Sequence, residues 1–96
     1  MAVKLERQQV AEGLQKLTQW TLRGDQIERL FTFENFVDAM IFVNKVAEIA
    51  EEEGHHPDIR IVYNQVTLTL TTHDAGGLTQ KDLQMARRID SLPGEV

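Results

Sequence analysis

The sequence predicts an α+β fold: one four-stranded antiparallel sheet with three helices packed on one face, in the order α-β-β-α-β-β-α. Two pairs of segments alternate between apolar and polar residues around a short turn, which indicates two β-hairpins. A long segment without Gly or Pro lies between the hairpins and has apolar residues at helical spacing. Shorter helical patterns precede the first hairpin and follow the second.

The three helices are predicted from the spacing of their apolar residues. The first covers about residues 6–17, and the long central helix covers residues 34–53 and ends at Gly54, a typical C-terminal cap. The last helix begins after Thr79, which forms a capping-box pattern with Asp82. The central helix has more apolar surface than one sheet needs, which indicates contact with a second subunit. Its stripe comprises Phe36, Ala39, Met40, Val43, Val46, Ala47 and Ala50, extended by Phe42 and Ile49, with Val37 and Ile41 apart from it.

The first hairpin is predicted around Gly24-Asp25, because glycine readily adopts the positive φ that two-residue turns require. A turn there pairs Leu22 with Ile27. The residues that then share one face, expected to point toward the core, are Trp20, Leu22, Ile27, Phe31 and Phe33. The indole of Trp20 could instead stack on a flat ligand, although core packing is the favoured interpretation.

The second hairpin is predicted around Asn64-Gln65, since Asn tolerates the left-handed conformation. This turn places the apolar residues of both strands on one face, in the pairs Tyr63–Val66, Ile61–Leu68 and Ile59–Leu70. Continued to the end of the strands, the same register sets His56 opposite His73, with Cβ atoms ~5 Å apart. The pattern therefore predicts that two distant histidines meet at one end of this hairpin.

The composition narrows the possible functions. Residues 1–96 fit a single domain, and a net charge of −5 without a basic run argues against nucleic-acid binding. The absence of cysteine removes disulfides, thiol nucleophiles and thiolate metal sites. No segment is long and apolar enough to cross a membrane, and the first residues lack the apolar core of a signal peptide. We therefore expect a cytoplasmic protein.

Histidines are concentrated in one stretch. Of the three in the chain, His55 and His56 are adjacent and follow a run of glutamates. Histidine is the one side chain whose ordinary pKa lies near neutral pH, so this cluster is suited to moving protons. Glu51 lies one helical turn before His55 and could orient an imidazole. Glu52 and Glu53 are interpreted as a solvated helix end, although three carboxylates there oppose the helix dipole.

Three kinds of chemistry were compared with these residues. Adjacent histidines point in different directions along an extended chain, and neither an HxH nor an HExxH spacing is present, so no metal is predicted. Nucleophilic catalysis lacks a candidate, because there is no cysteine and Ser91 lies in an expected loose tail. General acid–base catalysis on a small molecule, without a cofactor, is the remaining interpretation.

A spaced motif carries a resemblance to a known family. Its positions are Glu51, His55-His56-Pro57, Tyr63 after five intervening residues, His73 after nine more and Asp82 after a further eight. In this pattern the sequence resembles the pterin-4a-carbinolamine dehydratase family. Further similar positions extend the resemblance over nearly the whole chain: Leu17-x-x-Trp20, Phe31-x-Phe33-x-x-Phe36 and Val46-Ala47-x-x-Ala50-Glu51.

The resemblance implies a lyase that dehydrates a 4a-hydroxy-tetrahydropterin to quinonoid dihydropterin and water, in support of tetrahydropterin recycling. By position it implies that His55, His56 and His73 are the catalytic and pterin-contacting histidines. The acid is hypothesised to be His55 or His73, and acid–base chemistry by histidines requires no cofactor. The residues implied to line the pterin are Pro57, Thr72, Asp74 and Ala75, with Glu51 and Asp82 as supporting carboxylates.

The resemblance also implies self-association and one alternative function. Members of the family form dimers or tetramers, so we expect a homodimer or homotetramer joined through the central helix or a sheet edge. Some animal members bind a transcription factor. The alternative hypothesis is therefore a non-catalytic pterin-binding or protein-interaction module on the same fold.

Overall fold

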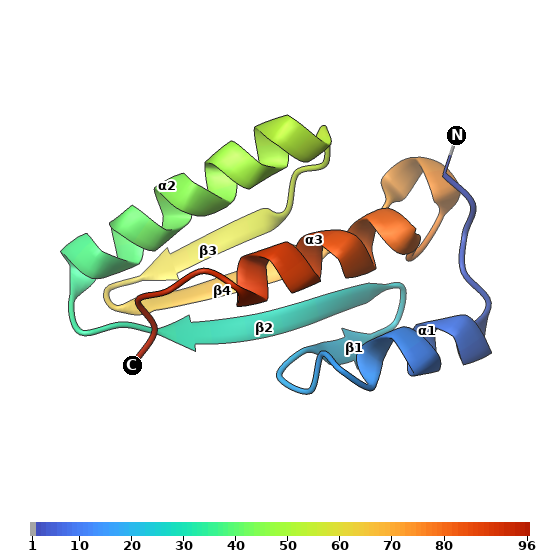
Figure 1. Ribbon diagram of the computed structural model, residues 1–96, viewed down its shortest axis with the longest axis horizontal. Coiled ribbons are helices and arrows are strands. Elements are labelled where there is room, and N and C mark those ends of the chain that lie inside the picture. The colour runs from blue at the N-terminus through green and yellow to red at the C-terminus, as the bar shows by residue number, and fades with distance from the viewer. Residues whose placement is uncertain (1) are drawn as a thin grey trace.

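The computed structural model describes residues 2–96, so Met1 lies outside the described residues, and it contains the predicted elements in the predicted order (Figure 1). Their bounds are α1 Arg7–Leu14, β1 Thr21–Arg23, β2 Gln26–Thr32, α2 Phe36–Glu53, β3 Asp58–Val62, β4 Gln65–Leu70 and α3 Gln80–Asp90, with a short 3₁₀ helix, η1, at His73–Ala75. The strands form one antiparallel sheet in the order β1-β2-β4-β3, so the two hairpins meet along β2 and β4. The α+β prediction is confirmed.

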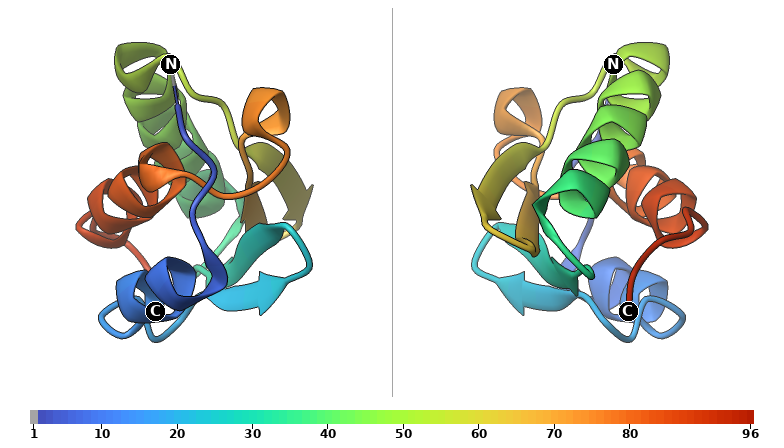
Figure 2. Two further views of the ribbon diagram at one scale, coloured as in Figure 1. Left: turned by 90° about the vertical axis from the view of Figure 1, so that its right-hand side faces the viewer. Right: turned by 90° about the vertical axis from the view of Figure 1, so that its left-hand side faces the viewer.

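The helices cover one face of the sheet, as both views in Figure 2 show. Side chains alternate between the two faces of each strand, and the covered face is the apolar one. The core between the layers includes Ile27, Phe31, Phe33, Phe42, Val46, Val66, Leu68, Leu70, Leu83 and Ile89. Within residues 2–96 no helix is long and apolar enough to span a membrane.

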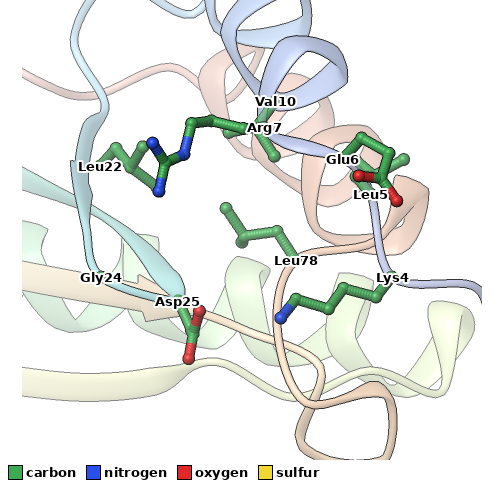
Figure 3. A pocket seen from close by; sticks show the side chains of 9 residues that line it. All are labelled: Lys4, Leu5, Glu6, Arg7, Val10, Leu22, Gly24, Asp25 and Leu78. Carbon is green, nitrogen blue, oxygen red and sulfur yellow. The ribbon is translucent and has the colours of Figure 1, made fainter.

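The first hairpin has the predicted register. Leu22 pairs with Ile27 across the turn at Gly24, which has a φ of 60°. Trp20 precedes β1 and is buried with its ring edge toward Phe31, at a centroid distance of 6.2 Å, so the core interpretation is confirmed. The expectation that Leu22 is buried is wrong. It is 45% exposed, because it faces a cavity of about 390 Å³ that separates this edge strand from α1 (Figure 3).

The second hairpin closes one residue earlier than predicted. Its turn residues are Tyr63 and Asn64 in place of Asn64 and Gln65, and Tyr63 has a φ of 50°. Ile61 therefore pairs with Val66, where Tyr63 was expected. A shift of two residues keeps Ile59 and Ile61 on the same face as Val66 and Leu68, because the strand has a period of two. The expectation that Tyr63 shares this core-facing side is wrong, since Tyr63 lies in the turn and is 64% exposed.

A tertiary contact of Asn64 accompanies the earlier turn. Its side-chain amide donates to the carbonyl of Phe33 at 2.9 Å, and its own carbonyl accepts from the Phe33 N–H at 2.8 Å. These bonds tie the β3–β4 turn to the end of β2. The predicted opposition of His56 and His73 is consequently wrong, since the observed register, if continued, sets His56 opposite Thr71.

The central helix α2 is capped as predicted but buries a rotated face. Gly54 ends it in the left-handed conformation, with a φ of 62°. Phe36 and Ala47, expected in the buried stripe, are exposed. The buried residues are Ala39, Phe42, Val46, Ile49 and Ala50. The opposite face exposes Val37 and Ile41.

The two ends of the chain also differ from the predicted pattern. Helix α1 covers residues 7–14 instead of 6–17, and Leu17 is buried beyond its end. The C-terminal segment contacts β2 rather than forming the expected loose tail. Arg29 of β2 binds Asp90 at 2.5 Å and Glu95 at 2.6 Å, and Asp90 also accepts from the Trp20 indole at 2.9 Å.

We expect Asp90→Ala to lower the free energy of unfolding by about 2–3 kcal/mol, because it leaves the largely buried Arg29 and the Trp20 N–H without their shared acceptor. Denaturant unfolding measures the loss. The control is Glu28→Ala, which breaks the exposed Arg23–Glu28 pair at 3.1 Å and should cost about 1 kcal/mol or less. Equal losses in the two variants would contradict the structural role of Asp90.

Candidate active site

The segments that carry the three histidines lie at the same end of the sheet. Because β3 and β4 are antiparallel neighbours, β3 begins at the end where β4 finishes. His55 and His56 directly precede β3, and His73 follows β4 in η1. Figures 1 and 2 show the link after α2 and the η1 turn at this end. The strand topology, and not the predicted ladder pair, accounts for this common location.

A buried carboxylate holds His55. Its Nε2 lies 2.5 Å from Oδ1 of Asp82, and the two side chains are 10% and 0% exposed. The second oxygen, Oδ2, accepts from the N–H of Thr79 at 2.9 Å and from the hydroxyl of Thr72 at 2.8 Å. The predicted capping box of α3 is confirmed. It uses only one oxygen of Asp82, which leaves the other oxygen for His55.

A carboxylate also contacts His56. Its Nε2 lies 2.5 Å from Oε2 of Glu51, and both side chains are largely exposed. Glu51 was predicted to orient an imidazole and was placed one turn before His55, but the ring that it contacts is that of the next residue. Since solvent screens such a pair, it contributes only ~0–1 kcal/mol.

The last two glutamates of α2 bind an arginine of α3. Arg88 donates to Glu52 at 2.6 Å and to Glu53 at 2.8 Å, which corrects the interpretation of these glutamates as a solvated helix end. These hydrogen bonds raise the pKa of Arg88 above its ordinary value, and the bond to Glu52 has the larger effect. They join the end of α2 to α3. They therefore help to fix the position of His55, which follows the end of α2, relative to Asp82 in α3.

The η1 turn carries three of the predicted site residues. His73 and Asp74 are exposed and Ala75 is half-buried. Gly76 closes the turn with a φ of 76°, and its N–H donates to the carbonyl of His73 at 3.0 Å. Within residues 2–96 the His73 ring makes no hydrogen bond. Pro57, the remaining apolar candidate, is half-buried in the link before β3.

Two residues of this site were missed or only partly understood from the sequence. Thr79 was identified as a helix cap, yet its hydroxyl also lies 2.9 Å from that of Thr72. Arg88 was not identified. A signal for it existed, because three carboxylates at the negative end of a helix favour a nearby cation.

Two cavities lie away from these histidines. The first, about 390 Å³, is bordered by α1, the β1–β2 turn and Leu78, which projects into it in Figure 3. Its charged side chains are all exposed and include both signs, so its lining selects no ligand charge: they are Lys4, Glu6, Arg7 and Asp25. The second, about 450 Å³, lies between the N-terminal segment and the start of α3. In the part of the chain that the structure describes, no three His, Asp or Glu residues form a metal-ligand cluster.

The fold and this arrangement define a small α+β protein with a histidine–carboxylate site. The family model described as pterin 4 alpha carbinolamine dehydratase matches residues 3–92. A relative from Thermomicrobium roseum, whose name as a pterin-4-alpha-carbinolamine dehydratase is provisional, is 49% identical over 89 residues, which are 93% of this chain and 96% of the relative. A similarly named relative from Acidobacterium capsulatum is 55% identical over 83 residues, 86% and 90% of the two chains. The chain therefore belongs to the pterin 4 alpha carbinolamine dehydratase family.

Solved structures agree with this assignment. A Brucella melitensis protein described as a transcriptional coactivator/pterin dehydratase superposes with a TM-score of 0.87 at 36% identity, over 92% of this chain and 96% of the other. A pterin dehydratase-like protein, described as a RuBisCO assembly factor in the alpha-carboxysome, has a TM-score of 0.62 at 23% identity, over 75% and 83%. This second likeness shows the shared fold alone.

Replacing Asp82 with Ala should lower the free energy of unfolding by about 2–4 kcal/mol, because it removes a helix cap and leaves buried donors unpaired. Thermal or denaturant unfolding reports the change. Glu48→Ala, at an exposed carboxylate of α2, is the control and should stay within about 0.5 kcal/mol of the parent protein. A similarly small effect at Asp82 would show that its hydrogen bonds do not hold the fold.

Proposed function

We propose that the protein is a hydro-lyase that removes water from a 4a-hydroxy-tetrahydropterin and so supports tetrahydropterin recycling. Membership of the family supports the class of reaction. The observation that carries the proposal is the contact of His55 with buried Asp82, at the end of the sheet that also bears His56 and His73. Histidines so placed can give and accept protons near neutral pH without a cofactor.

The proposed reaction requires two proton transfers. An acid protonates the hydroxyl oxygen on C4a, the C4a–O bond breaks, and water leaves with the bonding electrons. A base takes the proton from the neighbouring ring nitrogen, and the N–H electrons form the new C=N bond of the quinonoid product. The number of protons is unchanged overall, so a pair of histidines can complete the cycle by exchanging their roles.

His55 and His73 are the preferred pair for these transfers. The buried Asp82 orients His55, and a fixed orientation favours proton transfer because the donor and acceptor must be aligned. His73 is exposed on η1, with its ring free of hydrogen bonds to residues 2–96. His56 is largely exposed beside Glu51, which supports a role in contacting the substrate. Pro57, Asp74 and Ala75 border these histidines in sequence and are the proposed lining of the pterin.

His55→Ala and His73→Ala should each reduce the dehydration rate at least ~10²-fold if these residues act as acid and base. The measurement is the formation of quinonoid dihydropterin from freshly generated 4a-hydroxy-tetrahydropterin, compared with buffer. Lys45→Ala, on an exposed part of α2 three turns before His55, should keep full activity. No acceleration by the parent protein would remove the enzymatic proposal, and a fully active double variant would exclude acid–base roles for these histidines.

Self-association of the chain is the second part of the proposal. Val37 and Ile41 form an exposed apolar face on α2, opposite its buried face, and Phe36 is exposed in the first turn of the same helix. β3 is an edge strand whose outer side has no strand partner in the described chain. A homodimer or homotetramer that covers the helix face or extends the sheet would remove apolar surface or unpaired backbone groups from water.

Ile41→Lys should shift the protein toward smaller species if α2 forms the interface, because a charge would then be buried between subunits. Sedimentation velocity over a range of concentrations measures this shift. Val3→Lys introduces the same charge at an exposed apolar residue outside α2 and is the matched control. If the parent protein is oligomeric and Ile41→Lys leaves its sedimentation coefficient unchanged, the interface does not include this face of α2, and the sheet edge becomes the proposed interface.

A regulatory module is the alternative function. The description of the Brucella melitensis protein as a transcriptional coactivator/pterin dehydratase, together with the exposed apolar face of α2, supports it. The dehydration assay separates the two functions. A folded parent protein without turnover would favour the regulatory module, whereas turnover lost with the histidines supports the enzyme.

A further inference from the structure

Thr72 was expected to contact the substrate, but its polar groups are all engaged inside the protein. The residue is 8% exposed. Its hydroxyl donates to Oδ2 of Asp82 at 2.8 Å and lies 2.9 Å from the hydroxyl of Thr79. Its backbone N–H donates to the carbonyl of Gly77 at 3.1 Å, and its carbonyl accepts from the Gly77 N–H at 3.3 Å. Each polar group of Thr72 therefore already has a partner inside the protein.

We propose that Thr72 is a positioning residue that sets, through Asp82, which nitrogen of His55 exchanges protons. The proposal concerns two atoms of one ring. Nε2 of His55 faces the carboxylate, so Nδ1 is the nitrogen left to face a reacting molecule. The catalytic meaning of this assignment rests on the proposed function, whereas the assignment of the proton itself does not.

The contact with Asp82 determines where neutral His55 carries its proton. An ionised carboxylate has only acceptor oxygens, so a hydrogen bond to it requires the proton on Nε2. Nδ1 then has a free lone pair and acts as the base. Among residues 2–96, Asp82 provides the hydrogen bond made by this ring.

The hydroxyl of Thr72 keeps the carboxylate of Asp82 in the required plane. Rotation of an aspartate carboxyl group about its last torsion is broad, so a single donor defines its plane poorly. The Thr79 N–H and the Thr72 hydroxyl approach the same oxygen from two residues, at 2.9 and 2.8 Å. Together they hold Oδ2 in the interior and direct Oδ1 to His55.

The same residue connects this carboxylate to the turn that carries His73. Thr72 precedes η1, and its carbonyl also accepts from the Ala75 N–H at 3.1 Å. Thr72 thus binds the carboxylate that contacts His55 through its side chain, and the turn that carries His73 through its backbone. A change at Thr72 is therefore expected to affect the geometry of both histidines.

Nitrogen-15 NMR of the histidine side chains tests the proposal without requiring turnover. In the parent protein at high pH, neutral His55 should be protonated at Nε2. Thr72→Val and Thr72→Ala remove the hydroxyl and should give a mixture of tautomers, whereas Thr72→Ser should restore the parent spectrum. Thr71→Val is the matched control, because it loses a hydroxyl bond to the carbonyl of Asp25 at 2.6 Å, at the adjacent residue.

Kinetic measurement extends the test to catalysis. Loss of the hydroxyl should lower kcat about tenfold, the effect of one hydrogen bond to a charged group, while KM changes little. Thr72→Ser should restore kcat, and Thr71→Val should not change it. A spectral change without any dehydratase activity in the parent protein would support the positioning role and reject the proposed function.

Two results would overturn the inference. The first is a parent protein in which neutral His55 carries its proton on Nδ1, which can be read without any variant. The second is an unchanged His55 spectrum in a folded Thr72→Val or Thr72→Ala protein. The first result needs only the parent protein, so the proposal can be rejected even if the variants do not fold.

Discussion

A carboxylate that is fully removed from water costs several kcal/mol unless its oxygens are paired, and Asp82 meets this requirement through three contacts. The backbone of Thr79, the hydroxyl of Thr72 and the ring of His55 surround it. These groups come from the start of α3, the end of the β4 segment and the link after α2. The packing of these three segments therefore depends on the carboxylate of Asp82, and the candidate site is built around this carboxylate.

The other polar contacts between elements keep this carboxylate in place. Arg88 holds the last turn of α2 against α3, and Asn64 ties the β3–β4 turn to the end of β2. Arg29 joins β2 to the end of α3 through Asp90. Each contact joins residues distant in sequence, so the helices are oriented by hydrogen bonds as well as by the nonspecific burial of apolar side chains.

Support and exposure are divided among the three histidines in a way that suits acid–base chemistry. His55 is held from the interior, His56 lies in solvent beside Glu51, and His73 is exposed on a short turn. In the proposed reaction, the pterin would meet one ring held by Asp82 and two exposed rings at this end of the sheet. The exposed apolar face of α2 is a separate surface of the molecule, suited to contact with another chain.

Much of the architecture followed from local chemistry. Alternation and helical spacing predicted the four strands and the three α-helices, although not η1. Local backbone preferences predicted the cap at Gly54 and the capping box of Thr79 and Asp82, because these features depend on neighbours within a few residues. The histidine motif also indicated the family from sequence alone. Only the tertiary structure decided the register of the second hairpin, the pairing of Glu52 and Glu53 with Arg88, and the contact of His55 with Asp82. Those outcomes depend on how distant segments pack. The capping-box pattern, for example, predicts a partner for one carboxylate oxygen of Asp82, but it does not predict the partner of the other oxygen.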